Sequence, residues 1–255
     1  MRIVFVGTGA ADFSPLLQTA YQNKLGLDAR RSSSVLLNGH ILVDCGPHAP
    51  DSLRIQGIDL AEITDLFVTH FHADHYDPTR VAELASQTRE PLRIWYRSDA
   101  VPAPVPHAEF HPLPVGATVQ TGEWTVKALA ANHTQYPLHY DIETADCRLF
   151  YGCDGAWLLN DTFYAMRERA YDVMILDGTV GDYNGDFRLG EHNSIPMIRL
   201  MLASFRTQRV VAEEGVVCLS HIAPTLHTPH AELVEILKKD GMIAAFDGMV
   251  IERVR

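Results

Sequence analysis

The sequence predicts an α/β fold formed by a single domain that spans residues 1–255. Short runs of β-branched and aromatic residues alternate with segments that carry helix-start signals, a pattern typical of sheets covered by helices. Of the 255 residues, 47% are hydrophobic and 21% are charged, which suits a globular domain with a large core. The proline-rich segment 102–114 is predicted to be an extended connection and not a domain linker, because regular patterns resume on both sides.

The expected strands are short. Residues 34–37 and 41–44 flank Asn38-Gly39, which is a strong signal for a hairpin. Residues 65–69 form a buried strand that runs directly into a group of histidines. Further strands are expected at residues 2–6, 92–96, 125–129, 140–143, 148–152, 172–176, 216–219, 243–246 and 250–253.

Four helices are expected, at residues 78–86, 162–169, 195–205 and 229–239. Asp77-Pro78 and Thr228-Pro229 each place a capping side chain before a proline at the first helical position. Ser194-Ile195-Pro196 is a looser version of the same signal.

The charge balance limits the class of partner. Asp and Glu outnumber Lys and Arg by 32 to 21, which gives a net charge of -11. Duplex nucleic acid is therefore not expected as a partner, because its binding needs clustered cations. The apolar run before Gly7 is too short for a signal peptide or a membrane span. We expect a cytoplasmic protein without a membrane partner, and its four cysteines as buried free thiols.

The segment Thr69-His70-Phe71-His72-Ala73-Asp74-His75 carries the strongest chemical signal. Three histidines and one aspartate within six residues would need partners if they were buried. Neutral imidazole and carboxylate are good ligands for zinc, manganese and iron. The sequence therefore predicts a metal site at the end of this strand.

This spacing resembles the signature of the metallo-β-lactamase superfamily, and the resemblance continues in the same order with His133, Asp154 and His221. It implies an αββα four-layer sandwich of two mixed β-sheets flanked by helices. It also implies two divalent ions. His70, His72, His133 and Asp154 would bind the first ion, and Asp74, His75, His221 and the shared Asp154 would bind the second.

Residues around the ligands resemble the branch of ribonuclease Z and phosphodiesterases, and most closely the PhnP-type cyclic phosphodiesterases. The matching stretches are 7–9, 30–31, 42–46, 70–75, 132–133, 143–145, 153–155, His192, 220–222 and 246–249. The resemblance implies hydrolysis of a small phosphodiester, with cyclic phosphodiesters included, by a metal-activated water. It assigns catalytic roles to Asp74 and to His192, which would contact phosphate or protonate the leaving oxygen.

Two departures from that family alter the expectation. The PhnP-type enzymes carry an extra structural zinc on N-terminal cysteines, whereas residues 10–34 contain none and Ala223 follows His221-Ile222. We therefore predict no structural zinc. Tyr76-Asp77-Pro78 also replaces the family's usual ending of the histidine loop, so the exact substrate is not transferred.

Several assignments stay open at this stage. Asp44 and Asp177 are candidates for orienting ligand histidines, although a turn role is nearly as plausible for Asp44. The segment 11–34 is expected to be a long connection that could cover the site. Zinc, manganese and iron all suit the ligands, and a homodimer is possible. The other histidines are interpreted as surface or loop residues: His40, His48, His107, His111, His139, His227 and His230.

Three rival functions remain. A ribonuclease Z-like nuclease would need a basic arm, and residues 156–190 contain no Gly- and Lys-rich insertion. A lactone or thioester hydrolase of the same fold would use the same ligands. A non-enzymatic carrier or accessory protein is disfavoured by the intact ligand set.

Overall fold

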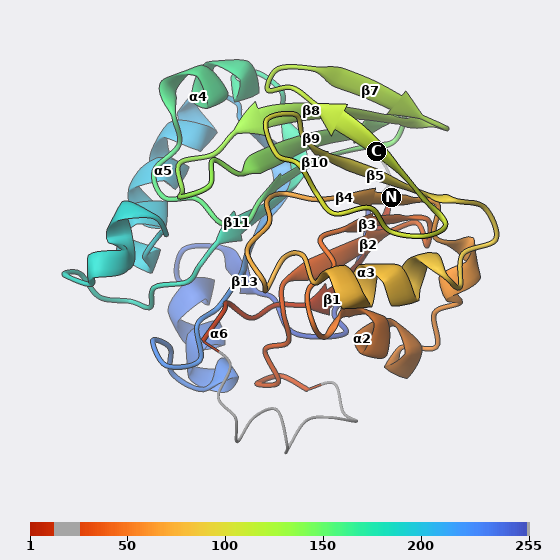
Figure 1. Ribbon diagram of the computed structural model, residues 1–255. Coiled ribbons are helices and arrows are strands. Elements are labelled where there is room, and N and C mark those ends of the chain that lie inside the picture. The colour runs from red at the N-terminus through yellow and green to blue at the C-terminus, as the bar shows by residue number, and fades with distance from the viewer. Residues whose placement is uncertain (13–25, 254–255) are drawn as a thin grey trace. The chain divides into compact units, whose positions relative to one another are not determined.

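The computed structural model describes residues 1–12 and 26–253 (Figure 1). Its chain contacts divide it into two compact units, one formed by Met1–Pro114 with Phe246–Glu252 and the other essentially by Val115–Ala245. Each unit contains one seven-stranded sheet. The expectation of a single domain stays a prediction, and most of the segment 11–34 lies outside the described residues.

The sheet of the first unit has the strand order β14-β1-β2-β3-β4-β5-β6. Strands β14, β1, β2 and β3 pair antiparallel, and β3 to β6 pair parallel. The turn between β2 and β3 has positive φ at both Asn38 and Gly39, as a tight hairpin requires. The strands are β1 (Arg2–Gly7), β2 (Ser34–Leu37), β3 (Ile41–Val43), β4 (Asp65–Phe67), β5 (Leu92–Arg97), β6 (Ala108–Leu113) and β14 (Val250–Glu252).

The core of this unit forms where helices α2 (Ala49–Ile55) and α3 (Pro78–Ala85) pack against one face of the sheet. Alternate strand residues such as Leu42, Leu66 and Ile94 meet the apolar sides of these helices. Helix α3 begins where predicted, because the Asp77 carboxylate accepts hydrogen bonds from the first backbone N–H groups. A 3₁₀ turn, η1 (Leu60–Glu62), leads into β4.

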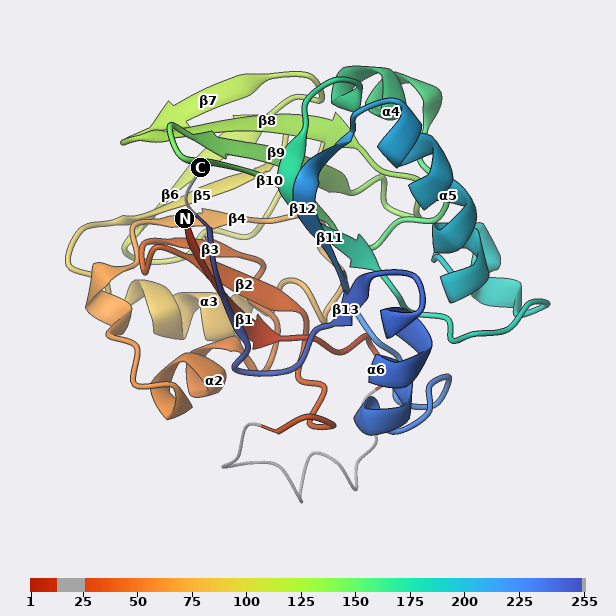
Figure 2. The same ribbon diagram turned by 180° about the vertical axis from the view of Figure 1, so that it is seen from behind.

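The sheet of the second unit has the order β13-β12-β11-β10-β9-β8-β7. Strands β7 to β10 pair antiparallel, and β10 to β13 pair parallel (Figure 2). The strands are β7 (Thr118–Thr121), β8 (Trp124–Ala130), β9 (Leu138–Thr144), β10 (Cys147–Gly152), β11 (Tyr171–Asp177), β12 (Val211–Ser220) and β13 (Met242–Ala244).

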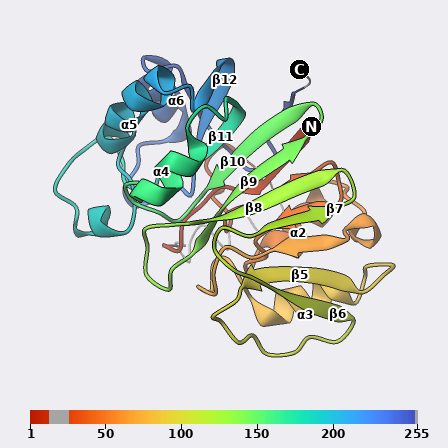
Figure 3. The ribbon, with the colours of Figure 1, turned by 90° about the horizontal axis from the view of Figure 1, so that it is seen from above.

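Helices α4 (Asn160–Met166), α5 (Ile195–Thr207) and α6 (His230–Lys238) pack on one face of this sheet (Figure 3). Phe150, Met174 and Leu219 from the strands meet Ile198 and Leu202 of α5 in a continuous core. Removing such side chains from water supplies most of the stabilisation of a sheet covered by helices. A 3₁₀ turn, η2 (Phe187–Gly190), precedes α5.

Most expected elements are present with shifted ends. One expectation was wrong, and two further elements had not been expected. The segment 102–114 was expected to be an extended connection, whereas it contains β6. Strand β6 lies at the edge of its sheet, where Pro112 does not remove an essential ladder bond. Helix α2 and strand β7 had no predicted counterpart. The four cysteines are buried and free, as expected.

Within the described ranges, no helix combines the length and the apolar character that crossing a bilayer requires.

Candidate metal centre

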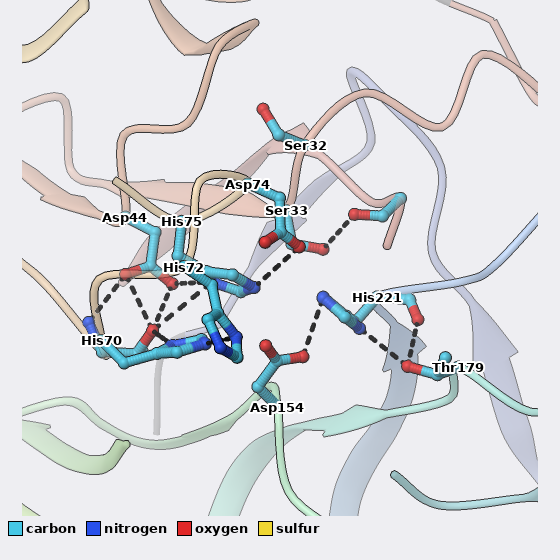
Figure 4. Close-up of polar contacts among 12 residues, drawn as sticks. Ser32, Ser33, Asp44, His70, His72, Asp74, His75, Asp154, Thr179 and His221 are labelled. Carbon is cyan, nitrogen blue, oxygen red and sulfur yellow. Dashed lines mark hydrogen bonds and ion pairs between the residues drawn. The ribbon is translucent and has the colours of Figure 1, made fainter. Parts of the chain in front are cut away.

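The histidine loop of the first unit follows β4 and folds back on itself. Backbone N–H groups of His75 and Tyr76 both donate to the carbonyl of His72, at 2.9 Å. The turn brings His70 Nε2 and His72 Nδ1 to within 2.8 Å of each other (Figure 4). Two ring nitrogens at this separation can share one proton or act together as ligands of one cation.

Asp44 fixes the orientation of His75. Its fully buried carboxylate lies 2.7 Å from His75 Nδ1 and accepts hydrogen bonds from the backbone N–H and hydroxyl of Thr69 (Figure 4). Burial raises the pKa of Asp44, while His75 and Thr69 act in the opposite direction. Because Asp44 holds Nδ1, the other nitrogen, Nε2, faces Asp74, whose Oδ2 lies 3.3 Å away. This is the arrangement of a carboxylate that orients a ligand histidine.

Gly46 lets the loop approach the sheet. A Cβ atom at this position would lie 1.9 Å from the carbonyl oxygen of Asp74 and 2.9 Å from Cβ of Ser32. The Cys45 N–H donates to the carbonyl oxygen of His75, and the Asp77 N–H donates to that of Cys45. These hydrogen bonds hold the loop against the residues before Gly46. Any larger residue at position 46 would therefore displace Asp74.

Three candidate ligands of the second unit lie just beyond strand ends. His133, Asp154 and His221 follow β8, β10 and β12 and are all buried. His221 Nε2 lies 2.8 Å from Asp154 Oδ1, and His133 Nε2 lies 3.9 Å from Asp154 Oδ2. These two imidazole nitrogens therefore face the same carboxylate.

The Nδ1 atoms of these two imidazoles also lie within hydrogen-bonding distance of polar groups. His221 Nδ1 lies 2.7 Å from the hydroxyl of Thr179, and His133 Nδ1 lies 2.9 Å from the carbonyl oxygen of Thr134. Each ring is thus fixed by one nitrogen while the other faces Asp154. The role of Thr179 had not been found from the sequence, where its only signal is its place two residues after the strand-end Asp177.

Asp177 connects several parts of this cluster. It accepts hydrogen bonds from the backbone N–H groups of Thr179 at 2.8 Å and Gly155 at 3.1 Å, and its Oδ2 lies 2.8 Å from His192 Nδ1. Burial raises the pKa of Asp177, but His192 and His221 outweigh it and hold the pKa below its usual value. Conversely, burial lowers the pKa of His192, but Asp177 and Asp154 leave it raised.

The ligand atoms of Asp154, Asp177, His192 and His221 lie within 4.8 Å of one another, and so do those of His133, Glu191 and His192. Glu191, which the sequence did not single out, has Oε2 3.8 Å from His133 Nε2. The donor set of each unit fits divalent ions of the zinc, manganese and iron type. The convergence of both sets on one dinuclear centre stays a prediction.

Two histidines interpreted as surface or loop residues are in fact buried. His139 lies in β9 and is 1% exposed, and His230 begins α6 and is 5% exposed. A Cβ atom on Gly155 would lie 2.7 Å from His139 Nε2, so this ring packs directly behind the Asp154 turn. Burial lowers the pKa of His139 to about 4, and the ring is therefore neutral at pH 7.

Known proteins of similar structure match nearly the whole chain. YhfI from Bacillus subtilis, solved as a metallo-β-lactamase fold protein, has a TM-score of 0.77 and 16% identity, over 98% of this chain and 99% of its own. The chain has the metallo-β-lactamase fold. The two seven-stranded mixed sheets with their helices are those of the predicted fold class.

Other proteins with the metallo-β-lactamase fold are nearly as similar. Zn²⁺-bound PqqB from Methylobacterium extorquens has a TM-score of 0.75 and 16% identity, over 99% of this chain and 100% of its own. A diphosphatase from the PhnP family has a TM-score of 0.70 and 16% identity, over 98% and 97%. Identities this low establish the shared fold and not a shared substrate.

Sequence comparisons cover only part of the metallo-β-lactamase fold. A family model described as anti-Pycsar protein Apyc1 matches residues 1–87. Ribonuclease Z of Pyrococcus abyssi is 26% identical over 163 residues, which are 58% of this chain and 50% of that protein. The chain thus matches about half the length of this curated relative.

Proposed function

We propose that the protein is a hydrolase that binds two divalent ions and cleaves a small phosphodiester, with cyclic phosphodiesters among its expected substrates. One observation carries the proposal: His75, His133 and His221 each have Nδ1 held by a neighbouring group, while Nε2 faces a carboxylate. Histidines that bind metals are held in this way.

The proposed ligands are those implied by the sequence resemblance. His70, His72, His133 and Asp154 bind the first ion, and Asp74, His75, His221 and the shared Asp154 bind the second. PqqB, which shares this fold along 99% of the chain, is Zn²⁺-bound, which supports the binding of a divalent metal by these residues. Bound ions supply positive charge for a phosphoryl group and lower the pKa of water.

The protein's own groups have two further tasks. Asp177 Oδ2 lies 2.8 Å from His192 Nδ1 and raises the pKa of the ring, so a proton on His192 Nε2 would be available to the leaving oxygen. Asp74 Oδ2 lies 3.3 Å from His75 Nε2, and we propose that this carboxylate would accept a hydrogen bond from the attacking water. The resemblance likewise names Asp74 and His192 as catalytic residues.

The remaining expectations belong to the same proposal. The ions are zinc, manganese or iron, and we propose no structural zinc. The partner is a small phosphorylated substrate, without duplex nucleic acid or a membrane. A cytoplasmic location and a possible homodimer complete the proposal.

The Asp154→Ala variant tests the centre directly. It should lose at least one ion per chain and nearly all hydrolysis, because Asp154 is a ligand of both ions. Metal content and hydrolysis of a phosphodiester panel, including cyclic sugar phosphates, are measured after stripping and after adding Zn²⁺, Mn²⁺ or Fe²⁺. Asp161→Ala, at an exposed aspartate in the first turn of α4, is the matched control. Full activity and unchanged metal content in Asp154→Ala would refute the ligand assignment.

Ribonuclease Z-like cleavage of RNA is the second candidate, favoured by the match to that enzyme. We rank it lower because the chain carries a net charge of -11 and residues 156–190 contain α4, β11 and η2 with no Gly- and Lys-rich insertion. Precursor tRNA, a thioester, a lactone and a phosphodiester assayed side by side decide among the candidates. Faster turnover of precursor tRNA would reverse the ranking.

A further inference from the structure

Two large aromatic side chains are exposed on the loops that carry His133 and Asp154. Tyr136 is 68% exposed in the loop between β8 and β9, and Trp157 is 48% exposed in the loop between β10 and α4. Each follows its candidate ligand by three residues. We infer that Tyr136 and Trp157 form a stacking surface for an uncharged aromatic ring on one ester arm of the substrate, an inference that rests on the proposed function.

The two loops are tied to each other and to the candidate ligand. The Ala156 N–H donates to the carbonyl oxygen of Asn132 at 3.0 Å, and the Asn132 side chain donates to the carbonyl oxygen of Trp157 at 3.2 Å. The backbone N–H of Tyr136 donates to the carbonyl oxygen of His133 at 3.3 Å. These hydrogen bonds hold the backbones that carry Tyr136 and Trp157 in a fixed relation to His133 and Asp154, as a specificity site on loops requires.

The backbone at Tyr136 adopts an uncommon conformation. Gln135 and Tyr136 have φ of 59° and 48°, and neither is glycine. Left-handed non-glycine residues cost free energy and are found preferentially where the strained geometry serves a site. At Tyr136 the left-handed backbone accompanies a ring that is 68% exposed.

The chemistry of the loops indicates the kind of ring. Residues 131–137 and 153–159 contain no Lys or Arg, and their one acidic residue is the candidate ligand Asp154. Away from His133 and Asp154, an ester arm that contacts these loops meets aromatic faces, apolar side chains and amides, with no Lys or Arg to pair with a charged arm. Aromatic side chains stack on planar rings largely irrespective of ring type, so an aryl group and a nucleobase share the required chemistry.

Three p-nitrophenyl phosphodiesters separate this inference from the proposed function. Their second arm is methyl, phenyl or thymidine, while the leaving group is the same. The natural protein should have kcat/KM about tenfold or more higher for the two ring-bearing esters than for the methyl ester. Tyr136→Ala and Trp157→Ala should lose this preference through KM, with kcat and the methyl ester unaffected.

Conservative and control variants exclude a general structural effect. Tyr136→Phe and Trp157→Phe keep a ring and should keep the preference. Tyr164→Ala removes a similarly exposed tyrosine from α4 of the same unit and should change neither the preference nor the rate. Thymidine 5′-monophosphate should saturably quench the tryptophan fluorescence of the natural protein. The quenching should be much smaller in Trp157→Phe, because stacking changes the fluorescence of the Trp157 ring.

The outcomes are distinguishable. Equal kcat/KM for all three esters, together with no saturable quenching, overturns the stacking surface and leaves the phosphodiesterase intact. If no ester is hydrolysed with any added metal, the proposed function fails and the quenching titration alone decides the stacking surface. A preference for thymidine over phenyl identifies a nucleobase as the ring, whereas equal preference supports any uncharged aryl arm.

Discussion

Replacing Asp44 by Asn tests whether a buried carboxylate sets the state of a candidate ligand histidine. Asp44 has φ of 61°, and Asn tolerates this left-handed conformation as Asp does. The variant therefore removes the charge with little change in side-chain shape or backbone strain. An Ala at the same position would add roughly 1–2 kcal/mol of strain and confuse the result.

The expected magnitude follows from the hydrogen bonds. The carboxylate accepts from the Thr69 N–H at 2.7 Å and from its hydroxyl at 2.9 Å, and lies 2.7 Å from His75 Nδ1. An Asn side chain offers one acceptor oxygen, so its NH2 group must face either Thr69 or His75. If the NH2 group faces His75, it donates to Nδ1, so the ring proton must lie on Nε2, the nitrogen proposed to bind metal. Loss of a supporting group of this kind weakens metal binding by about 10- to 100-fold.

Competition with a chelator on stripped and reloaded protein measures this affinity. Asp65→Asn is the matched control, since Asp65 is also buried in the first sheet but bonds Arg93 and Trp95. The control should lose stability without losing metal affinity. Unchanged affinity for both ions in Asp44→Asn would show that Asp44 does not orient the ligand.

Two further predictions concern protons. His192→Gln should slow phosphodiesters with alkoxide leaving groups by about 10²–10⁴ and scarcely affect p-nitrophenyl esters, whose leaving group needs no proton; equal losses on both would contradict the acid role. Burial raises the pKa of Asp247 to about 6, against the effects of Arg31, Thr8 and Arg30. A folded-state pKa above the unfolded value of about 4 means that this carboxyl contributes less stability as pH rises from about 4 to about 6. The unfolding free energy of the natural protein should therefore fall by about 3 kcal/mol over that window, whereas that of Asp247→Asn should not. Urea titration at several pH values measures the difference, and identical pH slopes for the two proteins would contradict this.

The sequence was sufficient for features that depend on local pattern. Apolar runs placed most strands within a few residues of their true ends, and Asp77-Pro78 placed the start of α3. The spacing of His70, His72, Asp74 and His75 indicates the metal chemistry by itself. These signals are readable because each depends on residues that are neighbours in the chain.

Features that depend on distant partners were not readable in this way. The proline content of 102–114 indicated an extended connection, but pairing with β5 decides that β6 forms there. His139 looked like any loop histidine, because its burial depends on β10 and on the turn at Gly155. Thr179 gained its role only when β11 and β12 brought it to His221.

The backbone itself carries a signal that residue patterns lack. Asp44, Asp154 and His221 adopt φ of 61°, 55° and 55° within two residues of the ends of β3, β10 and β12. Glycine would adopt this conformation at no steric cost, yet all three positions carry side chains that the proposed centre uses. Replacement by glycine would relieve a strain on the order of 1–2 kcal/mol per residue, but it would also delete a side chain that the proposed centre uses. The same conformation directly after a strand occurs at Asn38, where it forms the β2–β3 turn, so the backbone signal identifies candidate positions and the side-chain chemistry separates the three from a simple turn.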